Sequence, residues 1–394
     1  MDITPQSNLI MSINSILIAA NNYPTATDPV HTFLEQIAVA LSKRGIKVTV
    51  IAPSRIVQHF LRHTELHPKF REITVENGKT ITVYQPRYIT LGNRFENFNM
   101  WSARRAVCKI ASKINNKPDV CYGYFWHWAW AIYPYAKTSN LPLITHTGET
   151  PVILHDFYTE DKLKSFKEYV KGVVCNSSFC KQLSIDAKLA DDSKCEIFPN
   201  GINSKIFYPR DKQKLRADHG IKENDFVIAY TGWFNDNKGS VRVSNAIKKL
   251  NDTSIKSIFV GVNQDGNGNY EPTCEGIIFK GRLPHAEIPE WLSMADVFVF
   301  PTQHEGSSNV IVEAMACGLP IISSDRMFNW DVLDENNSIL IDPMNVDEIA
   351  AAIKTLKDNN QKREIMSQRA LETAEGLTIE KRVERIVKFI ESRI

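Results

Sequence analysis

Two glutamates separated by seven residues, Glu305 and Glu313, are the most informative feature of this chain. The residues that follow the first of them, Gly306 to Asn309, are small and polar, which predicts a turn that leads into a short helix. Small side chains leave the backbone N–H groups at the helix start uncovered, and such groups bind phosphate with the support of the helix dipole. A carboxylate inside the helix accepts hydrogen bonds from paired sugar hydroxyls. The pattern therefore suits a sugar nucleotide.

A lysine in the second half of the chain is a further candidate for chemistry. Lys238 lies in a loop that follows a strand expected from Asp225 to Thr231. An ammonium group at this place could neutralise the charge on a departing diphosphate. A solvated loop lysine is the alternative.

The segment from Pro301 to Asp325 resembles the E-x7-E signature of the retaining family-4 glycosyltransferases, which have the GT-B fold. The likeness includes the EG turn at Glu305 and the helix, turn and strand of EAMACGLPII, which begins at Glu313. The alternative is an amphipathic helix with a chance acidic residue, and the strand–turn–helix context argues against it. Residues 197–209, IFPNGINSKIFYP, are similar to the element that joins the two domains in the same family.

The resemblance implies roles for the matching residues on the donor side. Glu313 would accept from the ribose hydroxyls, and Glu305 would lie beside the transferred sugar near the reacting carbon. Gly232 ends the strand before the lysine loop, and the backbone of Arg282 and Leu283 would contact the base. The implied phosphate contacts are backbone N–H groups around Gly306, Ser307, Ser308, Asn309 and Val310.

Several of these residues have a competing interpretation. Asn309 could cap the helix instead of touching a ligand. His146 ends an expected strand, where the family often has a histidine that faces the transferred sugar, although a lone histidine is more often structural. His155 is a rival for that role. His127, with the aromatic rings around it, could line an acceptor pocket, and core packing is the better account for most of those rings.

The sequence departs from the family pattern in two places. The family usually has an arginine directly after the strand-end glycine, and this chain has Trp233 there. The first loop, Asn21 to Asp28, has no glycine, whereas members commonly have two, so its backbone is less suited to approach a ligand closely. The identity of the acceptor therefore does not transfer from the family.

Composition describes an ordinary globular enzyme. The chain has 394 residues, and its 47 basic and 45 acidic side chains nearly cancel, which gives no reason to expect a nucleic-acid partner. Its seven cysteines form no CxxC pair, which favours a reduced, cytoplasmic protein. No signal peptide or membrane span is expected. Scattered basic residues in the first half are compatible with a peripheral membrane contact, although an ordinary solvated surface is the favoured interpretation.

Apolar runs alternate with helical patterns throughout the chain, and the alternation restarts near residue 225. The first unit begins with a strand from Ser15 to Ala20, a helix capped by Asp28 and Pro29, and a strand from Lys47 to Ala52. We expect an α/β protein of the GT-B class, with two Rossmann-like domains whose parallel sheets face each other across a cleft. The expected domains are residues 1–205, with the last helix at 378–394 packed back onto them, and residues 206–377.

The function that follows is transfer of a hexose from a UDP- or GDP-linked sugar to a glycan or lipid-linked acceptor hydroxyl, with retention at the anomeric carbon. Residues 206–377 would bind the nucleotide sugar and residues 1–205 would supply most of the acceptor site. No cofactor and no metal is expected, because the chain has no D-x-D triplet and no other metal motif. Synthesis of cell-surface polysaccharide is inferred from family frequency. The alternatives are a sugar-nucleotide epimerase or hydrolase on the same fold, and a non-catalytic subunit that binds a partner.

Overall fold

The computed structural model describes residues 12–25, 32–62, 66–264, 266 and 268–394. The expected helix cap at Asp28 and Pro29 lies outside the described residues, and the helix that follows is described from Thr32. The chain divides into two compact units. Unit 1 comprises residues 1–176, 180–198 and 383–394, and unit 2 comprises residues 177–179 and 199–382.

An eight-stranded sheet forms the centre of unit 1, in the order β10-β9-β8-β7-β1-β2-β5-β4. Its strands are β1 (Ser15–Ala19), β2 (Lys47–Ile51), β4 (Phe70–Thr74), β5 (Thr80–Tyr84), β7 (Val120–Tyr124), β8 (Leu143–Thr147), β9 (Val170–Cys175) and β10 (Cys195–Ile197). All neighbours pair in parallel except β4, which runs antiparallel to β5. Two short strands, β3 (Ser54–Arg55) and β6 (Arg87–Tyr88), form a separate pair.

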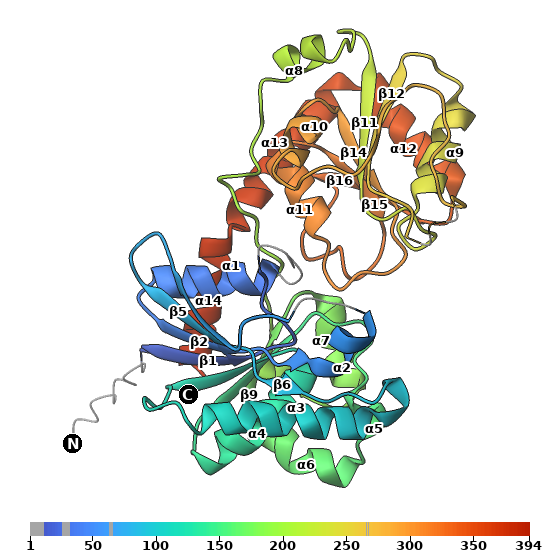
Figure 1. Cartoon of the computed structure of the whole chain (residues 1–394). Helices are drawn as coiled ribbons and strands as arrows, with labels where there is room; N and C mark the ends of the chain where they lie inside the picture. Colours follow the sequence, from blue (N-terminus) through green and yellow to red (C-terminus); the bar gives the residue numbers. More distant parts are fainter. Residues whose placement is uncertain (1–11, 26–31, 63–65, 265, 267) are drawn as a thin grey trace, which may run out of the picture. The chain divides into compact units, whose positions relative to one another are not determined.

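Helices cover both faces of this sheet (Figure 1). They are α1 (Thr32–Lys43), α2 (Ile56–Arg62), α3 (Glu96–Ala111), α4 (Trp126–Thr138), α5 (Leu154–Phe157), α6 (Glu160–Tyr169), α7 (Ser178–Asp186) and α14 (Ile379–Glu391), with 3-10 turns η1 (Asn93–Phe95) and η2 (Asp192–Lys194). One core joins α3, α4 and α6 to the sheet and includes Trp126, Phe166 and Leu143, all without exposed surface. The middle strands β7 and β8 are buried at every position, as is typical of parallel strands covered by helices on both faces.

Unit 2 has a six-stranded, fully parallel sheet in the order β13-β12-β11-β14-β15-β16. The strands are β11 (Phe226–Thr231), β12 (Ile255–Val260), β13 (Ile277–Gly281), β14 (Val297–Phe300), β15 (Ile321–Ser324) and β16 (Ser338–Ile341). The helices are α8 (Lys212–Asp218), α9 (Ser240–Leu250), α10 (Ile288–Ser293), α11 (Asn309–Ala316), α12 (Val346–Asp358) and α13 (Asn360–Gly376). Helices α9 and α12 pack on each other, as do α11 and α13, and Figure 1 shows the sheet between these two pairs of helices.

The sheet order of unit 2 fixes where a ligand fits. Strand β11 is central. The strands that follow it in sequence, β12 and β13, lie on one side of it, and the later strands, β14 to β16, lie on the other side. In parallel α/β sheets such a switch point opens a crevice at the carboxyl ends of the strands. Gly261, directly after β12, allows the backbone to come close to the loop after β11. A Cβ at this residue would lie 1.9 Å from the carbonyl oxygen of Gly232. The two loops after β11 and β12 therefore meet closely at this edge.

Both α/β units were expected from the sequence, but some elements were not. The antiparallel edge strand β4 and the helices α3 and α13 are additions to the expected alternation. At the carboxyl end of the chain, residues 383–394 group with unit 1, whereas residues 378–382 group with unit 2.

Candidate active site

A cavity of about 360 Å³ lies at the carboxyl edge of the sheet in unit 2. Most of the residues expected on the donor side line it, from three strand ends and from the start of α11. They are Gly232, Lys238, Arg282, Leu283, Glu305, Ser307, Ser308, Asn309 and Val310, together with Trp233. Gly306 and Glu313, which were expected to contact the donor, are not among its lining residues.

The N-terminus of α11 carries no side-chain cap. Ser308 occupies the cap position with an extended backbone, and its side chain makes no capping hydrogen bond. The buried Oγ of Ser308 and the buried Oδ1 of Asn309 have no hydrogen-bond partner. Asn309 is the first helical residue rather than the cap, so the capping role considered for it from the sequence is wrong. The helix tip at the cavity thus keeps free the N–H groups and the positive end of its dipole.

Two hydrogen bonds orient the backbone of the turn before α11. The hydroxyl of Ser177 donates to the carbonyl oxygen of Gly306 at 2.5 Å, and the amide of Asn200 donates to that of Ser307 at 3.3 Å. In a trans peptide the C=O and the following N–H point in opposite directions. Holding these two carbonyls therefore turns the N–H groups of Ser307 and Ser308 away from Ser177 and Asn200.

Lys238 and Glu305 form an ion pair at the cavity wall, between Nζ and Oε1. The side chains are 18% and 16% exposed. Burial raises the pKa of Glu305, and the neighbouring Lys238 ammonium opposes that rise. The side chain of Asn237 joins the two loops, since it donates to the carbonyl of His304 at 3.1 Å and accepts from its N–H at 2.9 Å. These contacts fix the ammonium beside the turn that leads to α11.

Glu313 lies on the second turn of α11 and pairs with a histidine that the sequence did not single out. The Nε2–H of His285 donates to Oε1 of Glu313 at 3.0 Å, and the Glu313 side chain is only 8% exposed. This hydrogen bond is the largest cause that raises the pKa of His285. His285 lies two residues after Leu283 of the expected base loop, and that position was the available signal for it.

Trp233, at the place of the family arginine, is an exposed residue of the cavity wall. Half of its side chain is exposed, and its carbonyl oxygen accepts from the hydroxyl of Tyr230 at 2.9 Å. The wall therefore has an indole where the family has a guanidinium. The cationic side chains that line the cavity are Lys238 and Arg282.

His146 lies in the interior of unit 1. Its ring has no exposed surface, and its Nδ1 lies 3.1 Å from the hydroxyl oxygen of Tyr122. The rings of Tyr124 and Phe125 pack on it, with centroids at 4.5 and 5.8 Å. An exposed ring that faces a sugar was expected, and the structure gives His146 no such surface, because β8 is buried on both sides. The side chain of its rival, His155, lies outside the described part of the structure.

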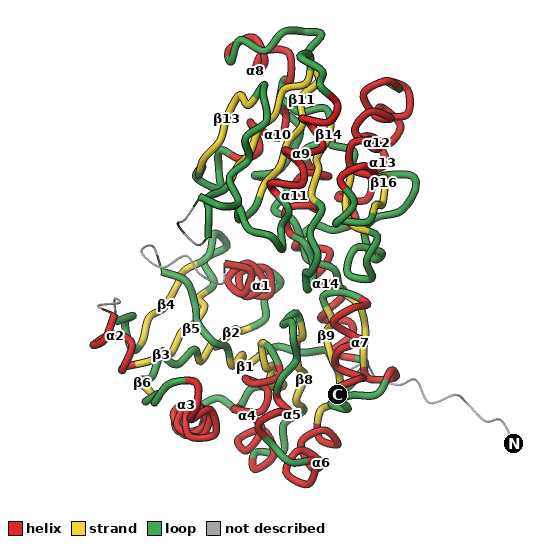
Figure 2. The backbone as a smooth tube through the Cα atoms, turned by 90° about the vertical axis from the view of Figure 1, so that its right-hand side faces the viewer, coloured by secondary structure: helices red, strands yellow, loops and turns green. Residues whose placement is uncertain are grey.

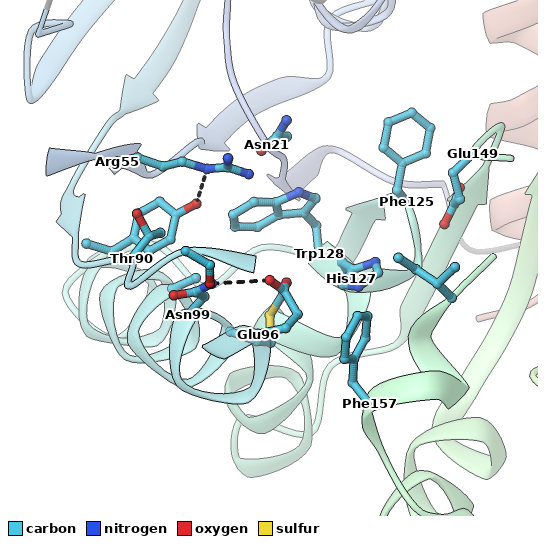
Figure 3. A pocket seen from close by; sticks show the side chains of 15 residues that line it. Asn21, Arg55, Thr90, Glu96, Asn99, Phe125, His127, Trp128, Glu149 and Phe157 are labelled. Atoms are coloured by element: carbon cyan, nitrogen blue, oxygen red, sulfur yellow. Dashed lines mark hydrogen bonds between the residues drawn. The ribbon is translucent and has the colours of Figure 1, made fainter. Parts of the chain in front are cut away.

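A second cavity, of about 460 Å³, lies in unit 1 and is lined by His127 (Figure 3). Other polar side chains that line it are Asn21, Arg55, Glu96 and Asn99, and aromatic lining comes from Phe125, Trp128 and Phe157. Glu149, also in the lining, accepts from the N–H of Trp126 at the start of α4 at 2.8 Å. Burial lowers the pKa of His127, which favours a neutral ring. The expectation that His127 and neighbouring rings could border a pocket agrees with this placement.

Two family profiles together match most of the chain. The profile described as Glycosyltransferase Family 4 matches residues 30–205, and the profile described as Glycosyl transferases group 1 matches residues 211–373. The chain belongs to family 4 of the glycosyltransferases.

Relatives and solved structures agree with this assignment. The chain is 27% identical over 354 residues to TuaC of Bacillus subtilis, a protein assigned to teichuronic acid biosynthesis as a glycosyltransferase, with 86% of this chain and 88% of TuaC covered. It is 27% identical over 277 residues to the UDP-Gal:alpha-D-GlcNAc-diphosphoundecaprenol alpha-1,3-galactosyltransferase of Escherichia coli, with 64% and 69% covered. Sucrose-phosphate synthase from Thermosynechococcus elongatus has the same fold at a TM-score of 0.74 and 17% identity, over 96% of this chain and 98% of that one. Anabaena HepE, solved in complex with UDP, matches at a TM-score of 0.72 and 18% identity, over 97% and 100%. These likenesses confirm the GT-B fold class expected from the sequence.

The described residues offer neither a metal centre nor a membrane span. No group of three or more His, Cys, Asp or Glu side chains in the described ranges is arranged to hold a metal ion. None of the helices in those ranges is both long enough and apolar enough to cross a bilayer.

Proposed function

We propose that this glycosyltransferase moves a hexose from a nucleotide diphosphate sugar to an acceptor hydroxyl with retention at the anomeric carbon. The observation that carries the proposal is the uncapped tip of α11, which lies at a cavity wall beside the ammonium of Lys238. The tip would bind the diphosphate through the N–H groups of Ser307 to Val310. Lys238 would neutralise the charge that grows on the leaving diphosphate, and stabilisation of this kind is usually the largest single contribution to catalysis.

The remaining donor contacts are proposed from the same geometry. The base would lie against the backbone of Arg282 and Leu283, and Glu313 would accept from the ribose hydroxyls. Since Glu313 does not line the cavity, that contact requires the ribose to displace or share the hydrogen bond of His285. A UDP-linked donor is favoured over a GDP-linked one, because the names of the galactosyltransferase relative and of the HepE structures contain UDP.

The contacts of one carboxylate support retention. Among the described residues that line the cavity, Glu305 alone carries a carboxylate. Glu305 is paired with Lys238 through Oε1, and we propose that this pairing, rather than nucleophilic attack, is its role. Attack by the acceptor on the same face, assisted by the leaving phosphate, needs no such nucleophile. Glu305 would then hold Lys238 in place and stabilise the positive charge at the reacting carbon. The proposed role of His146 at the transferred sugar has no exposed ring to support it, and His127 is the better placed histidine of unit 1.

The acceptor is proposed to bind in unit 1 and to be a glycan or a lipid-linked sugar. The cavity in that unit combines polar side chains with aromatic rings, as sugar sites do. The name of the Escherichia coli relative contains a diphosphoundecaprenol acceptor, and TuaC is assigned to teichuronic acid biosynthesis. Both support a role in the synthesis of polysaccharide or glycoconjugate.

The test combines nucleotide binding with turnover. Calorimetry with UDP, GDP and ADP should give heat with UDP, and the absence of heat with all three would contradict the donor site. Release of UDP from UDP-galactose or UDP-glucose should depend on a synthetic lipid-diphosphate-linked N-acetylglucosamine. Release at the same rate without that acceptor would instead favour the hydrolase or epimerase alternative. The anomeric coupling constant of the product, measured by NMR, decides retention.

Lys238→Ala provides the test at a single side chain. We expect a loss of turnover of about 100-fold or more, by analogy with removal of one group that stabilises developing negative charge. Lys214→Ala, which removes an exposed lysine on α8 of the same unit, is the matched control and should leave turnover unchanged. Normal turnover in the Lys238 variant would remove the leaving-group role.

A further inference from the structure

A run of exposed apolar side chains precedes and enters α3 in unit 1. Large apolar residues are normally exposed singly, and several that are close together in the chain indicate an interaction surface. Four such residues lie within thirteen positions, and each is about half exposed. They are Ile89 at 48%, Leu91 at 52%, Phe95 at 54% and Trp101 at 53%.

The same stretch is strongly basic. Residues 89–117 contain one acidic residue, Glu96, and six basic residues, whereas the whole chain has a net charge of only +2. The basic residues are Arg94, Arg104, Arg105, Lys109, Lys113 and Lys117. Glu96 does not offset them at the surface, because its carboxylate lies at the cavity of unit 1 (Figure 3).

Helix α3 separates its residues into two faces. The buried face consists of Asn99, Met100, Ala103, Val107 and Ala111, which pack on the unit. The opposite face presents Trp101, Arg105 and Lys109 at four-residue spacing, and all three are exposed. The helix runs along the surface of unit 1, where Figure 2 shows it end-on.

Side-chain contacts hold the tryptophan at this surface. The Arg105 guanidinium lies 5.1 Å from the centre of the Trp101 ring, and the Phe98 ring centroid lies 5.6 Å from it. An amphipathic ring beside flexible cations is the combination that anchors proteins at the boundary between lipid headgroups and acyl chains. A purely basic face would suit any polyanion, and a purely apolar face would suit another protein.

We propose that the outer face of α3, with the loop at residues 89–95, docks onto the surface of an anionic lipid bilayer. Arg105 and Lys109 contact the headgroups, and Trp101, Phe95 and Leu91 insert at the interface. The charge complementarity with anionic lipid selects this occupant over a neutral partner.

The position of this face connects it with the cavity. The inner side of the same segment, at Thr90, Gly92, Glu96, Asn99 and Met100, lines the cavity of unit 1. Docking of the outer side therefore brings this cavity to the bilayer surface. This last step rests on the proposed function, in which unit 1 holds the acceptor, and it makes a lipid-linked sugar the acceptor class that the docked enzyme reaches.

The experiment is flotation of the full chain, without substrate, on vesicles of phosphatidylcholine alone or of phosphatidylcholine mixed with phosphatidylglycerol at about one part in three. The lipid concentration is about 1 mM and the salt is about 0.1 M, where screening acts over roughly 10 Å. We expect binding to the anionic vesicles only. Each basic residue near such a surface contributes about fivefold to partitioning, so Arg105→Glu with Lys109→Glu should reduce binding by at least about 20-fold.

Trp101→Ala should reduce binding several-fold, and brominated lipid should quench the fluorescence of the wild type more than that of Trp101→Phe. The matched controls lie in unit 2: Trp330→Ala, which removes a tryptophan of similar exposure, and Lys214→Glu with Lys222→Glu, which reverses two exposed charges. They should bind vesicles like the wild type. UDP calorimetry on every variant checks the fold and the donor site separately, so that a failed donor proposal and a failed docking proposal give different results.

Three outcomes would overturn the docking proposal. One is equal binding to neutral and anionic vesicles. Another is loss of binding on charge reversal without any effect of Trp101→Ala or of brominated lipid, which would indicate a soluble polyanion. The third is absence of binding to the anionic vesicles. A dimer in sedimentation that Trp101→Ala dissociates would then make this face a contact between two copies of the chain.

Discussion

Two side-chain pairs lie at or near the proposed donor cavity. Lys238 is bound to Glu305, and His285 is bound to Glu313, each pair joining an element near the cavity to α11 or to the turn before it. Burial of a single charge costs far more free energy than burial of a pair. Each partner therefore lowers the cost of burying the other. An arriving diphosphate would meet an ammonium that is already positioned.

The pair of His285 and Glu313 gives a pH-dependent prediction. The pKa of His285 is raised by its hydrogen bond to Glu313, so Glu313→Gln should lower that pKa toward its ordinary value of about 6.5. A raised pKa in the folded protein adds stability that is fully present below the unfolded pKa and is lost as the pH rises through the folded pKa. The variant should therefore lose more free energy of unfolding at about pH 5.5 than at about pH 8.5. NMR titration of the imidazole and urea unfolding at both pH values are the measurements.

Glu287→Gln, at an exposed carboxylate close in sequence, is the control and should leave the imidazole titration unchanged. Equal destabilisation by Glu313→Gln at both pH values would contradict the linkage. The same variant should weaken UDP binding, and unchanged affinity would remove the proposed ribose contact.

The sequence pattern singled out both residues of the pair Lys238–Glu305, but only Glu313 of the pair His285–Glu313. Lys238, Glu305 and Glu313 stand in a recognisable pattern, whereas His285 lies 28 residues from Glu313 and meets it only through the fold. His146 illustrates a different limit. Its place at the end of β8 was predictable, but a strand buried on both faces has no periodicity that would tell an exposed side chain from an interior one.

At the scale of elements, the site depends on a short helix that begins without a cap. A missing cap typically costs about 1 kcal/mol of stability, and in return the free N–H groups at the start of α11 stay available for an anion. Stability and binding are therefore opposed at Ser308.

A substitution at Ser308 should change stability and binding in opposite directions. Ser308→Asp places a carboxylate at the helix tip, where it can accept from the N–H groups and complement the dipole. We expect about 0.5–1 kcal/mol of added stability in urea unfolding. We also expect UDP affinity to fall by at least about 10-fold, because the new charge would occupy the proposed phosphate position and repel the phosphate. Calorimetry with UDP measures the second effect.

Ser308→Ala removes the hydroxyl without adding a charge, so it separates the effect of the lost hydroxyl from the effect of the new carboxylate. The Ser308 hydroxyl makes no capping hydrogen bond, so alanine should leave the free energy of unfolding nearly unchanged and should retain UDP binding. A variant with aspartate that is both more stable and equally tight for UDP would show that the phosphates lie elsewhere.

The elements that the sequence predicted well are those whose burial leaves a strong pattern. Strands β11 and β14 are buried throughout and appear as continuous apolar runs. Strand β4 alternates between exposed and half-buried positions at the sheet edge, and its sequence has no continuous apolar run. Helix α13 buries only Met366, Ala370 and Ala374, which is too thin a stripe to stand out.

At the scale of the whole molecule, unit 1 is built from segments that are distant in the sequence. Residues 383–394 complete it, although the chain between residues 199 and 382 belongs to unit 2. The division falls inside α14, a continuous helix from Ile379 to Glu391, so no glycine, proline or change of composition marks it in the sequence. Only the packing of the helix reveals to which unit each half belongs.

Phe389 is the residue through which the end of the chain should stabilise unit 1. It is 4% exposed, its ring lies 5.5 Å from that of Phe198, and a Cβ at Gly172 would approach it to 2.8 Å. Phe389→Ala removes this ring from a tightly packed place, and such changes cost about 3–5 kcal/mol. We expect that loss to appear as faster hydrogen exchange in β9, which contains Gly172. The strands of unit 2 should exchange as before, because their own core is unchanged.

Ile365→Ala, at a half-exposed residue of unit 2, is the control and should change exchange in neither unit by more than about 0.5 kcal/mol. UDP binding should survive in the Phe389 variant under conditions where β9 has lost protection, since the donor cavity lies within unit 2. Faster exchange in β11 and β14 to the same extent as in β9 would mean that the two units unfold as one. The end of the chain would then stabilise the whole molecule rather than the unit with which it packs.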